Sequence, residues 1–485
     1  MAAASYVLTL PLKVELWQEH ILEKRLDIGR KIYNACLGEM LRRYKLMIRQ
    51  PEYWAAIHMP KGKDRSKKLK DFRESYGVSE YSLNMYVQDM GRKFKKNIGS
   101  QMAQNIAKRA CQAVEKLMYG KAKKVSFKSA GDFYSLEEKT NKTGFRYFSG
   151  REEIRWLGLE MPVVLKKKDA YAHSALKDKI KYCRLLKKVI RGKNRYFVQF
   201  CLEGIPPLKP GREASDSTDE TARVGIDIGT STIAVASEES VEIRELAEGL
   251  SMDEKKKRIV QRRLDRQRRA NNPNKYNPDK TVNRSNQEKW VKGRNYEKTR
   301  MSLQEINRKM AEKRKQSHCQ YANHLISLGL DMRVEKMQFQ GLQKRAKETK
   351  INEKTGRYQR KKRFGRSIST RAPALLLTIL DRKLKAKGLE LKRIKTTEVK
   401  ASQFEHFTQT YTKKTLGRRW NDFPQGRVQR DMYSAFLIMN TNEKLDEVDV
   451  ERCNRTWENF LKRHHEEINR LNGLEKKQLR SMGIN

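Results

Sequence analysis

The sequence predicts a multidomain α+β protein, in which a small β-barrel with a helical insertion is followed by an α/β domain. Three observations support this prediction. A helical pattern fills residues 16–119, short β-rich runs separated by Gly and Asn fill 121–208, and strands alternate with helices after residue 222. A chain of 485 residues corresponds to two to four domains of typical size.

Charge is the most unusual property of the composition. The chain has 107 Lys and Arg against 58 Asp and Glu, a net charge of +49. Hydrophobic residues still make up 37% of the chain, which is enough to form cores. The positive charge is therefore expected on the surfaces of folded domains rather than in a disordered tail. The composition therefore indicates a polyanionic partner.

Export and membrane insertion are not expected. No apolar run approaches the ~20 residues that a membrane span needs, and the opening MAAASYVLTLPLKVELW lacks the blocks of a signal peptide. The six cysteines include no C-x-x-C pair, which disfavours a disulfide framework and a zinc ribbon built from local pairs. We expect a cytoplasmic protein.

The first half of the chain is divided by its hydrophobic periodicity. Helical spacing is clearest before Gly120, where one apolar stripe is formed by Ile98, Met102, Ile106, Ala110, Ala113 and Leu117. The β-like runs that follow are KKVSFKS, TGFRYFSG, IRWLGLEMPVVL and RYFVQFCLEG, and the opening VLTLPLKVEL is also β-like. We predict a barrel from 1–15 and 120–208, with 16–119 inserted, so that the first strand pairs with strands more than a hundred residues later.

The second half begins after a Pro-, Ser- and acid-rich stretch, and we predict a linker at 209–222. GIDIGTSTIAVAS at 225–237 then predicts a buried strand, a Gly turn and a second strand. Residues 251–316 are helical, with 22 Lys and Arg against 8 Asp and Glu, and NNPNKYNPDK marks a loop between two long helices. The strands MRVEKMQF and ELKRIKTT and a helix at 374–386 continue the α/β pattern, and 441–485 is nearly neutral and weakly helical.

Three acidic residues stand at element ends. Asp227 lies inside an apolar strand just before a Gly turn, Glu335 ends a short strand, and Asp431 starts an apolar helix. Each position also has an ordinary explanation. Asp227 could accept N–H bonds from the 229–230 turn, Glu at a strand end is common, and Asp431 could cap its helix.

In combination, the three acids have the order and structural context of a ribonuclease-H-like nuclease. Clustered carboxylates repel one another and become protonated unless divalent cations neutralise them. Two hard metal ions on oxygen ligands can activate a water and stabilise the leaving oxygen in phosphodiester cleavage. We therefore predict that Asp227, Glu335 and Asp431 are both catalytic and metal-binding, with two Mg²⁺ ions or Mn²⁺ in substitution.

The chain resembles the TnpB family of transposon-encoded, RNA-guided DNA endonucleases, which are related to compact type V CRISPR effectors. The most specific segments are GIDIGTSTIAVAS, RRLDRQRRANNPNKYN, KKRFGRSISTRAP and VQRDMYSAFLIM. By this resemblance the three acids match the RuvC-type catalytic residues. It also implies that the barrel and its insertion are wedge and recognition elements that bind guide RNA and a short motif next to the DNA target.

The resemblance further implies a division of the second half. The RuvC-like core would comprise 223–250, 317–397 and 428–440, with a basic helical insertion at 251–316, a target nucleic-acid-binding insertion at 398–427 and a tail at 441–485. Family members usually carry a zinc ribbon in the target-binding insertion. Residues 400–431 here contain no cysteine, so zinc is not expected, and His406 is predicted to be a packed or solvent-exposed residue rather than a ligand.

Clusters of basic residues are predicted to contact nucleic acid, because phosphate would relieve their mutual repulsion. The segment 341–371 carries 12 Lys and Arg against two Glu and would suit a mobile loop beside the nuclease site, or a disordered one. Trp420 and Tyr433 are candidates for base stacking or for core positions. The predicted contacts are Lys121, Lys123, Lys124, Lys128, Arg262, Arg263, Arg266, Arg268, Arg269, Lys361, Lys362, Arg363, Arg366, Arg371, Lys413, Lys414, Arg418, Arg419, Arg427 and Arg430.

The resulting hypothesis is a transposon-associated RNA-guided DNA endonuclease with one RuvC-type site. Its partners would be a guide RNA, a target DNA duplex and the displaced single strand, with no membrane involved. Two alternatives stay open: a compact type V CRISPR effector, and an RNA-guided DNA-binding protein without cleavage. A sugar kinase or actin-like ATPase, in which D-I-G-T also occurs, is disfavoured by the charge and by the lack of a later Gly-rich adenosine-binding stretch.

Overall fold

The structure is a computed structural model that describes residues 4–208, 219–279, 281–344, 348, 351–353, 356, 364–415, 417–475 and 478–484. It divides into two compact units, Met1–Pro210 and Gly211–Asn485. The first ten residues of the predicted linker, 209–218, lie outside the described residues. Within the described part of the chain, no helix combines the length and the apolarity needed to cross a membrane.

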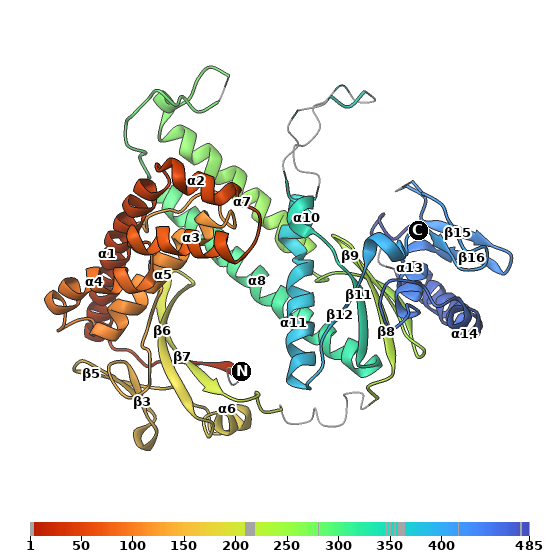
Figure 1. Ribbon diagram of the computed structural model, residues 1–485, viewed down its shortest axis with the longest axis horizontal. Helices are drawn as coiled ribbons and strands as arrows, with labels where there is room; N and C mark the ends of the chain where they lie inside the picture. Colours follow the sequence, from red (N-terminus) through yellow and green to blue (C-terminus); the bar gives the residue numbers. More distant parts are fainter. Residues whose placement is uncertain are drawn as a thin grey trace. The chain divides into compact units, whose positions relative to one another are not determined.

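The helices of the first unit form where the apolar periodicity predicts them (Figure 1). α1 (Leu16–Met47) packs against α5 (Ser100–Met118), and the predicted stripe on α5 is confirmed, because Met102, Ile106 and Ala110 are buried. Three shorter helices connect them: α2 (Pro51–His58), α3 (Lys63–Ser75) and α4 (Glu80–Lys93). All contribute to one core shared with the strands of this unit.

The strands of the first unit form two antiparallel sheets. The larger has the order β1-β7-β6-β2 and is built from β1 (Ser5–Pro11), β2 (Ser135–Glu137), β6 (Ile180–Ile190) and β7 (Lys193–Glu203). The smaller consists of β3 (Arg146–Phe148), β4 (Glu153–Trp156) and β5 (Leu159–Pro162). An isolated bridge between Leu12 and Val163 joins the sheets.

Two sequence expectations can be compared with these sheets. The long-range pairing of the first strand is confirmed, since Ser5 lies opposite Glu203. The strand predicted at KKVSFKS is wrong, because residues 123–129 have no strand partner and form irregular backbone. The closed barrel stays a prediction. A short helix, α6 (Ala170–Ala175), leads into β6.

The second unit is organised around a five-stranded mixed sheet of order β10-β9-β8-β11-β12. Its strands are β8 (Arg223–Ile228), β9 (Thr232–Ala236), β10 (Val241–Glu245), β11 (Asp331–Glu335) and β12 (Lys392–Ile394). β8, β9 and β10 form an antiparallel meander, while β11 runs parallel to β8 and to β12. The predicted α/β pattern is thereby confirmed.

Helices cover both faces of this sheet (Figure 1). On one face, α8 (Arg294–Leu328) and α11 (Pro373–Ala386) pack on the apolar side chains of β8 and β11. On the other lie α13 (Arg430–Met439) and α14 (Val450–Asn472). α8 passes through the predicted domain boundary at 316/317 as one continuous helix, and its part after the boundary packs in the core through Tyr321, Leu325 and Ile326. The other helices are α7 (Ser251–Ala270), α9 (Phe339–Leu342), α10 (Gly365–Arg371) and α12 (Thr396–Val399).

The predicted target-binding insertion contains two small hairpins instead of long elements. They are β13 (Phe404–Glu405) with β14 (Thr410–Tyr411), and β15 (Trp420–Phe423) with β16 (Gly426–Gln429). Their apolar side chains join a core with α13 and α14, in which Trp457 of α14 packs against Phe407, Phe423 and Tyr433. The segment 441–485, which the sequence marked as weakly helical, thus contains a helix of 23 residues that completes this core.

Candidate active site

The strand pair β8 and β11 sets two of the predicted acids side by side. The strands are parallel, and Arg333 lies opposite Gly225. Because successive side chains point to opposite faces, Asp227 shares a face with Gly225, and Glu335 shares that face with Arg333. Continuing the same register by two residues places Glu335 level with Asp227. Strand pairing therefore brings together two acids that are far apart in the sequence.

The third acid is brought to the same face by α13. This helix packs on β8 so closely that a Cβ on Gly225 would lie 2.0 Å from the Ala435 carbonyl oxygen and 2.4 Å from the Met439 nitrogen. Only glycine allows two backbones to approach in this way. Asp431 lies in the first turn of α13. The N-cap is Gln429, so the alternative that Asp431 caps the helix is wrong.

Burial and mutual repulsion shift the pKa values of two of these acids. Burial raises the pKa of Asp227 well above its ordinary value, and repulsion from Asp431 and then from Glu335 raises it further, while Arg430 lowers it. Burial also raises the pKa of Glu335. All three side chains are nevertheless half-buried, so solvent still reaches them. Groups that are enclosed, mutually repelling and accessible are typical of functional sites.

The alternative role of Asp227 in its turn does not match the hydrogen bonds. The Gly229 N–H donates to the Thr232 carbonyl oxygen at 2.9 Å, which closes the turn without the aspartate. α10 packs on the same turn, where the Ser367 hydroxyl donates to the Thr230 carbonyl oxygen at 2.7 Å and lies 2.6 Å from the Ser231 hydroxyl. The turn is thus fixed by its neighbours, and Asp227 is available for another role.

Asp431 is paired with arginine. Its Oδ1 accepts hydrogen bonds from Arg430 Nη2 at 2.9 Å and Nε at 3.1 Å, and its Oδ2 lies 3.7 Å from Arg419 Nη1. Within the ranges that the structure describes, no three His, Cys, Asp or Glu side chains are gathered closely enough to hold a metal ion. The donor chemistry, three half-buried carboxylates that repel one another, fits a hard divalent cation. For all three to hold one ion, Asp431 has to turn away from Arg430.

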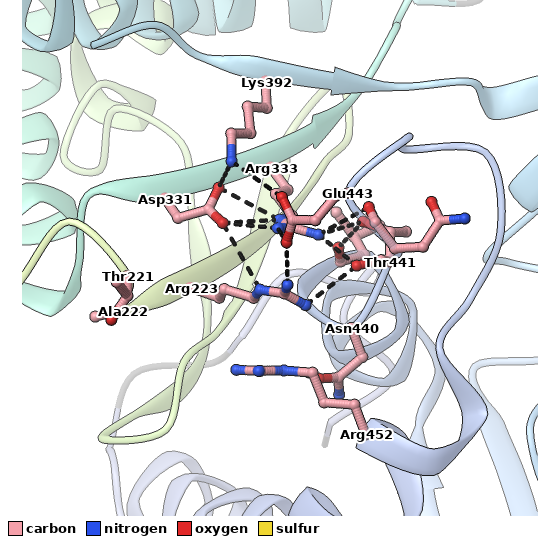
Figure 2. Close-up of polar contacts among 12 residues, drawn as sticks. Thr221, Ala222, Arg223, Asp331, Arg333, Lys392, Asn440, Thr441, Glu443 and Arg452 are labelled. Atoms are coloured by element: carbon pink, nitrogen blue, oxygen red, sulfur yellow. Dashed lines mark hydrogen bonds and ion pairs between the residues drawn. The ribbon is translucent and has the colours of Figure 1, made fainter. Parts of the chain in front are cut away.

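A second charged cluster fixes the opposite end of α13 (Figure 2). Arg333, which is fully buried, donates to Asp331 Oδ2 at 2.7 Å, to Glu443 Oε1 at 2.9 Å and to the carbonyl oxygens of Thr441 and Asn442. Lys392 Nζ lies 2.9 Å from Asp331 Oδ1. Because Thr441 comes just after Asn440, the C-cap residue of α13, this cluster ties the C-terminal end of the helix to the start of β11.

The predicted basic contacts fall into two groups. Some lie exposed on the surface, available to a partner: Lys121, Lys123, Lys124, Lys128, Arg262, Arg263, Arg266 and Lys413. Others have partners within the protein. Arg268 and Arg269 pair with Asp265 at 3.2 Å and 3.0 Å and lie over the Tyr276 ring, so they stabilise the loop after α7.

Near the acids, most of the predicted basic residues also have internal partners. Arg418 and Arg427 both pair with Asp422 at 3.1 Å, and Lys414 donates to Asn421. Arg366 pairs with Glu254, and Arg371 lies 2.5 Å from Glu245. Lys361, Lys362 and Arg363 lie outside the described residues.

The aromatic candidates are separated by their burial. Tyr433 is 1% exposed and its hydroxyl lies 2.7 Å from His406 Nδ1, so it is a core residue and cannot stack on a base. Trp420 is half-buried and donates from Nε1 to the Gly483 carbonyl oxygen at 2.8 Å. His406 is buried among aromatic rings, which confirms the prediction of a packed residue, and burial lowers its pKa to about 4.

Several residues around the acids were not identified from the sequence. Arg333 carried a readable signal, because a strand with charges at every second position, as in Asp331, Arg333 and Glu335, predicts one polar face. Gly225 carried none, since its close contact with α13 depends on a distant segment. Gln429 and His464 carried none: both look like ordinary polar residues, and their burial depends on distant segments.

Comparisons with known proteins give no family. No protein-family profile matches the chain, and no curated protein sequence matches it. Solved structures that align with most of its length include the following two. A Cas12f1–sgRNA–target DNA complex aligns at 10% identity and a TM-score of 0.43, covering 91% of this chain and 99% of the other. A CRISPR-Cas12f ternary complex aligns at 13% identity and a TM-score of 0.27, covering 88% and 82%.

Proposed function

We propose that the protein is a transposon-associated, RNA-guided DNA endonuclease that hydrolyses phosphodiester bonds at one RuvC-type site. The observation that carries the proposal is geometric: the register of β8 and β11 sets Asp227 level with Glu335, and α13, packed on Gly225 of the same face, carries Asp431 in its first turn. The strand order, an antiparallel meander followed by two parallel strands, supports a ribonuclease-H-like core.

The three acids have distinct positions in this proposal. Asp227 and Glu335 lie level on adjacent strands, so they would hold a cation from the floor of the site, and Asp431 would hold it from the first turn of α13. Their raised pKa values mean that Asp227 and Glu335 gain from a cation that stabilises their charged forms. Magnesium, when bound, supplies Lewis-acid chemistry to the phosphodiester and the attacking water.

The carboxylate of Asp431 is paired with the guanidinium groups of Arg430 and Arg419. Both guanidinium groups carry several donors, and phosphate oxygens are acceptors that they bind in the same geometry as a carboxylate. We infer that a DNA phosphate entering the site takes these donors, which frees Asp431 to face Asp227. Substrate entry and completion of the acidic site would thus be linked.

The RNA-guided part of the proposal rests on charge and on the resemblance of four segments to TnpB. A net charge of +49 on folded units is suited to holding an RNA and a DNA duplex together, since each phosphate contact adds affinity irrespective of sequence. Base pairing with the guide would then supply the sequence specificity.

The test is cleavage by protein co-expressed with the DNA that flanks its gene. RNA that co-purifies is sequenced, and the complex is incubated with Mg²⁺ and plasmids carrying the matching target beside randomised neighbouring bases. We expect cutting by the wild type, loss of cutting in Asp227→Asn, Glu335→Gln and Asp431→Asn, and retained target binding in all three. Asp381→Asn, which changes a carboxylate of α11 paired with Lys385, is the matched control and should cut normally.

The outcomes separate the alternatives. RNA from the gene's own flank supports the transposon type, and repeat-derived RNA supports a CRISPR effector. Target binding without cutting by the wild type would indicate a guided binding protein. If no RNA is enriched, the guided function is wrong.

A further inference from the structure

The residue before the helix of Asp431 is held in an unusual way. Gln429 ends β16 and is fully buried, and both its side chain and its backbone N–H make hydrogen bonds. Its side-chain oxygen accepts from the Met432 N–H at 2.8 Å, and its side-chain nitrogen donates to the Met482 carbonyl oxygen at 3.0 Å. Its backbone N–H donates to His464 Nε2 at 3.0 Å. One residue thus caps α13 and joins it to two parts of the C-terminal segment.

The acceptor on α14 is itself fixed. His464 is 1% exposed and packs between the rings of Trp420 and Phe460. Because its Nε2 accepts a hydrogen bond from a backbone N–H, the ring is the neutral tautomer with its proton on Nδ1. Leaving a buried backbone N–H without an acceptor is costly, so His464 holds Gln429 in one position.

The last described residues make further contacts with the same hairpin. Trp420 Nε1 donates to the Gly483 carbonyl oxygen, and Met482 and Ile484 are buried in the core with α14. Gly483 has φ +70°, and a Cβ on it would lie 2.4 Å from the Arg419 Cβ. Arg419 is the residue whose guanidinium lies 3.7 Å from Asp431. The C-terminal segment therefore contacts both strands of the β15–β16 hairpin that leads into the candidate site.

We propose that Gln429 and His464 are positioning residues for Asp431, and that the C-terminal segment holds the β15–β16 hairpin in place next to it. The inference rests on the proposed role of Asp431 as a ligand of the divalent cation. Asp431 is two residues from Gln429, so the direction of its side chain follows from how the first turn of α13 is held. Neither residue contacts the carboxylate itself.

The test compares substitutions that keep or remove each hydrogen bond. His464→Gln keeps a side-chain acceptor for the Gln429 N–H, and His464→Leu fills similar space without one. Gln429→Asn keeps an oxygen of the kind that caps helices, and Gln429→Leu removes it. Mn²⁺ binding is measured by electron paramagnetic resonance on the full-length guide-bound protein. The Mg²⁺ dependence of cleavage and the affinity for target DNA are measured in parallel, and thermal melting confirms folding.

For both Leu variants we expect Mn²⁺ affinity to fall by about 10-fold or more, as for other outer partners of metal ligands. The Mg²⁺ concentration for half-maximal cutting should rise in proportion, with target affinity unchanged, and His464→Gln and Gln429→Asn should stay closer to the wild type. Wild-type Mn²⁺ affinity in folded Leu variants would overturn the inference. The inference would also be overturned if His464→Gln and Gln429→Asn lost as much Mn²⁺ affinity as the Leu variants. A loss of target affinity as large as the loss of Mn²⁺ affinity would overturn it too.

The inference and the proposed function fail in different ways. One outcome is that the wild type binds Mn²⁺, Asp431→Asn does not, and no target DNA is cut. The proposed function is then wrong, but the comparison of the Gln429 and His464 variants still tests their role in positioning Asp431. If the wild type binds no Mn²⁺, Asp431 is not a metal ligand and the inference is overturned.

Discussion

Gly225 of β8 and Ala435 of α13 bring two backbones so close together that no side chain fits between them. A Cβ at residue 225 would lie 2.0 Å from the Ala435 carbonyl oxygen. Asp227 lies two residues after the glycine, and Asp431 lies one turn before the alanine. This contact therefore sets the distance between two of the three acids.

Gly225→Ala should consequently damage both stability and the site. The new Cβ meets backbone atoms, which cannot move aside as a flexible side chain would, so we expect a loss of about 3 kcal/mol in the free energy of unfolding, the upper end of the usual cost of overpacking. Urea denaturation measures it. Gly417→Ala is a suitable control, because a Cβ there has no neighbour within 4 Å, and it should change stability by less than about 0.5 kcal/mol. Equal stabilities would show that α13 shifts freely on the sheet.

Asp227→Asn should stabilise the protein in the absence of divalent cations. The amide removes a charge that burial and two neighbouring carboxylates disfavour, and the gain should be on the order of 1–3 kcal/mol at pH 7. Folding raises the pKa of Asp227, so the ionised carboxylate is less favourable in the folded protein than in the unfolded chain. The free energy of unfolding of the wild type therefore falls as pH rises above the ordinary carboxyl range. Thermal melts in EDTA from pH 4 to 8 should show the two proteins diverging with pH. A constant difference would contradict the assignment.

Buried histidines should give a pH dependence of the opposite sign. Burial lowers the pKa of His406 and of His464 to about 4, below the ordinary 6.5. As pH falls, these histidines therefore take up protons in the unfolded chain before they do so in the folded protein. Stability is then full above pH 6.5 and is lost as pH falls towards 4, by at most about 3 kcal/mol for each residue. The slope of unfolding free energy against pH should flatten in His464→Gln. Replacement of the exposed His20 by Gln should leave the slope unchanged, and an unchanged slope in both variants would count against the prediction.

Arg333→Met should be strongly destabilising. The substitution leaves Asp331 and Glu443 with less positive charge around them and frees the carbonyl oxygens of Thr441 and Asn442, and breaking a buried ion pair in this way costs about 3–5 kcal/mol. Arg418→Met, which removes an exposed pair with Asp422, should cost less than about 1 kcal/mol. Similar losses for the two variants would mean that the cluster in Figure 2 does not anchor α13.

Local signals in the sequence determined which elements form and which of them carry acids. The apolar stripe of α5, the strands around Asp227 and Glu335 and the apolar helix after Asp431 are all visible in the spacing of their side chains, because period and burial are properties of a few neighbouring residues. KKVSFKS shows the limit of this: its alternating side chains resemble a strand, but a strand also needs a partner for its hydrogen bonds.

Only the tertiary structure decided how the acids are held. The sequence contains Gly225, Arg333, Gln429 and His464 but does not state that the first meets Ala435, that the second binds Thr441, or that the last two share a hydrogen bond. Those contacts join residues up to 210 positions apart, and each depends on several elements packing at once. The C-terminal segment is the plainest case. Its near-neutral composition predicted a weak helix, and packing on two small hairpins made it part of the core behind Asp431, because an amphipathic face is stable only where another apolar surface covers it.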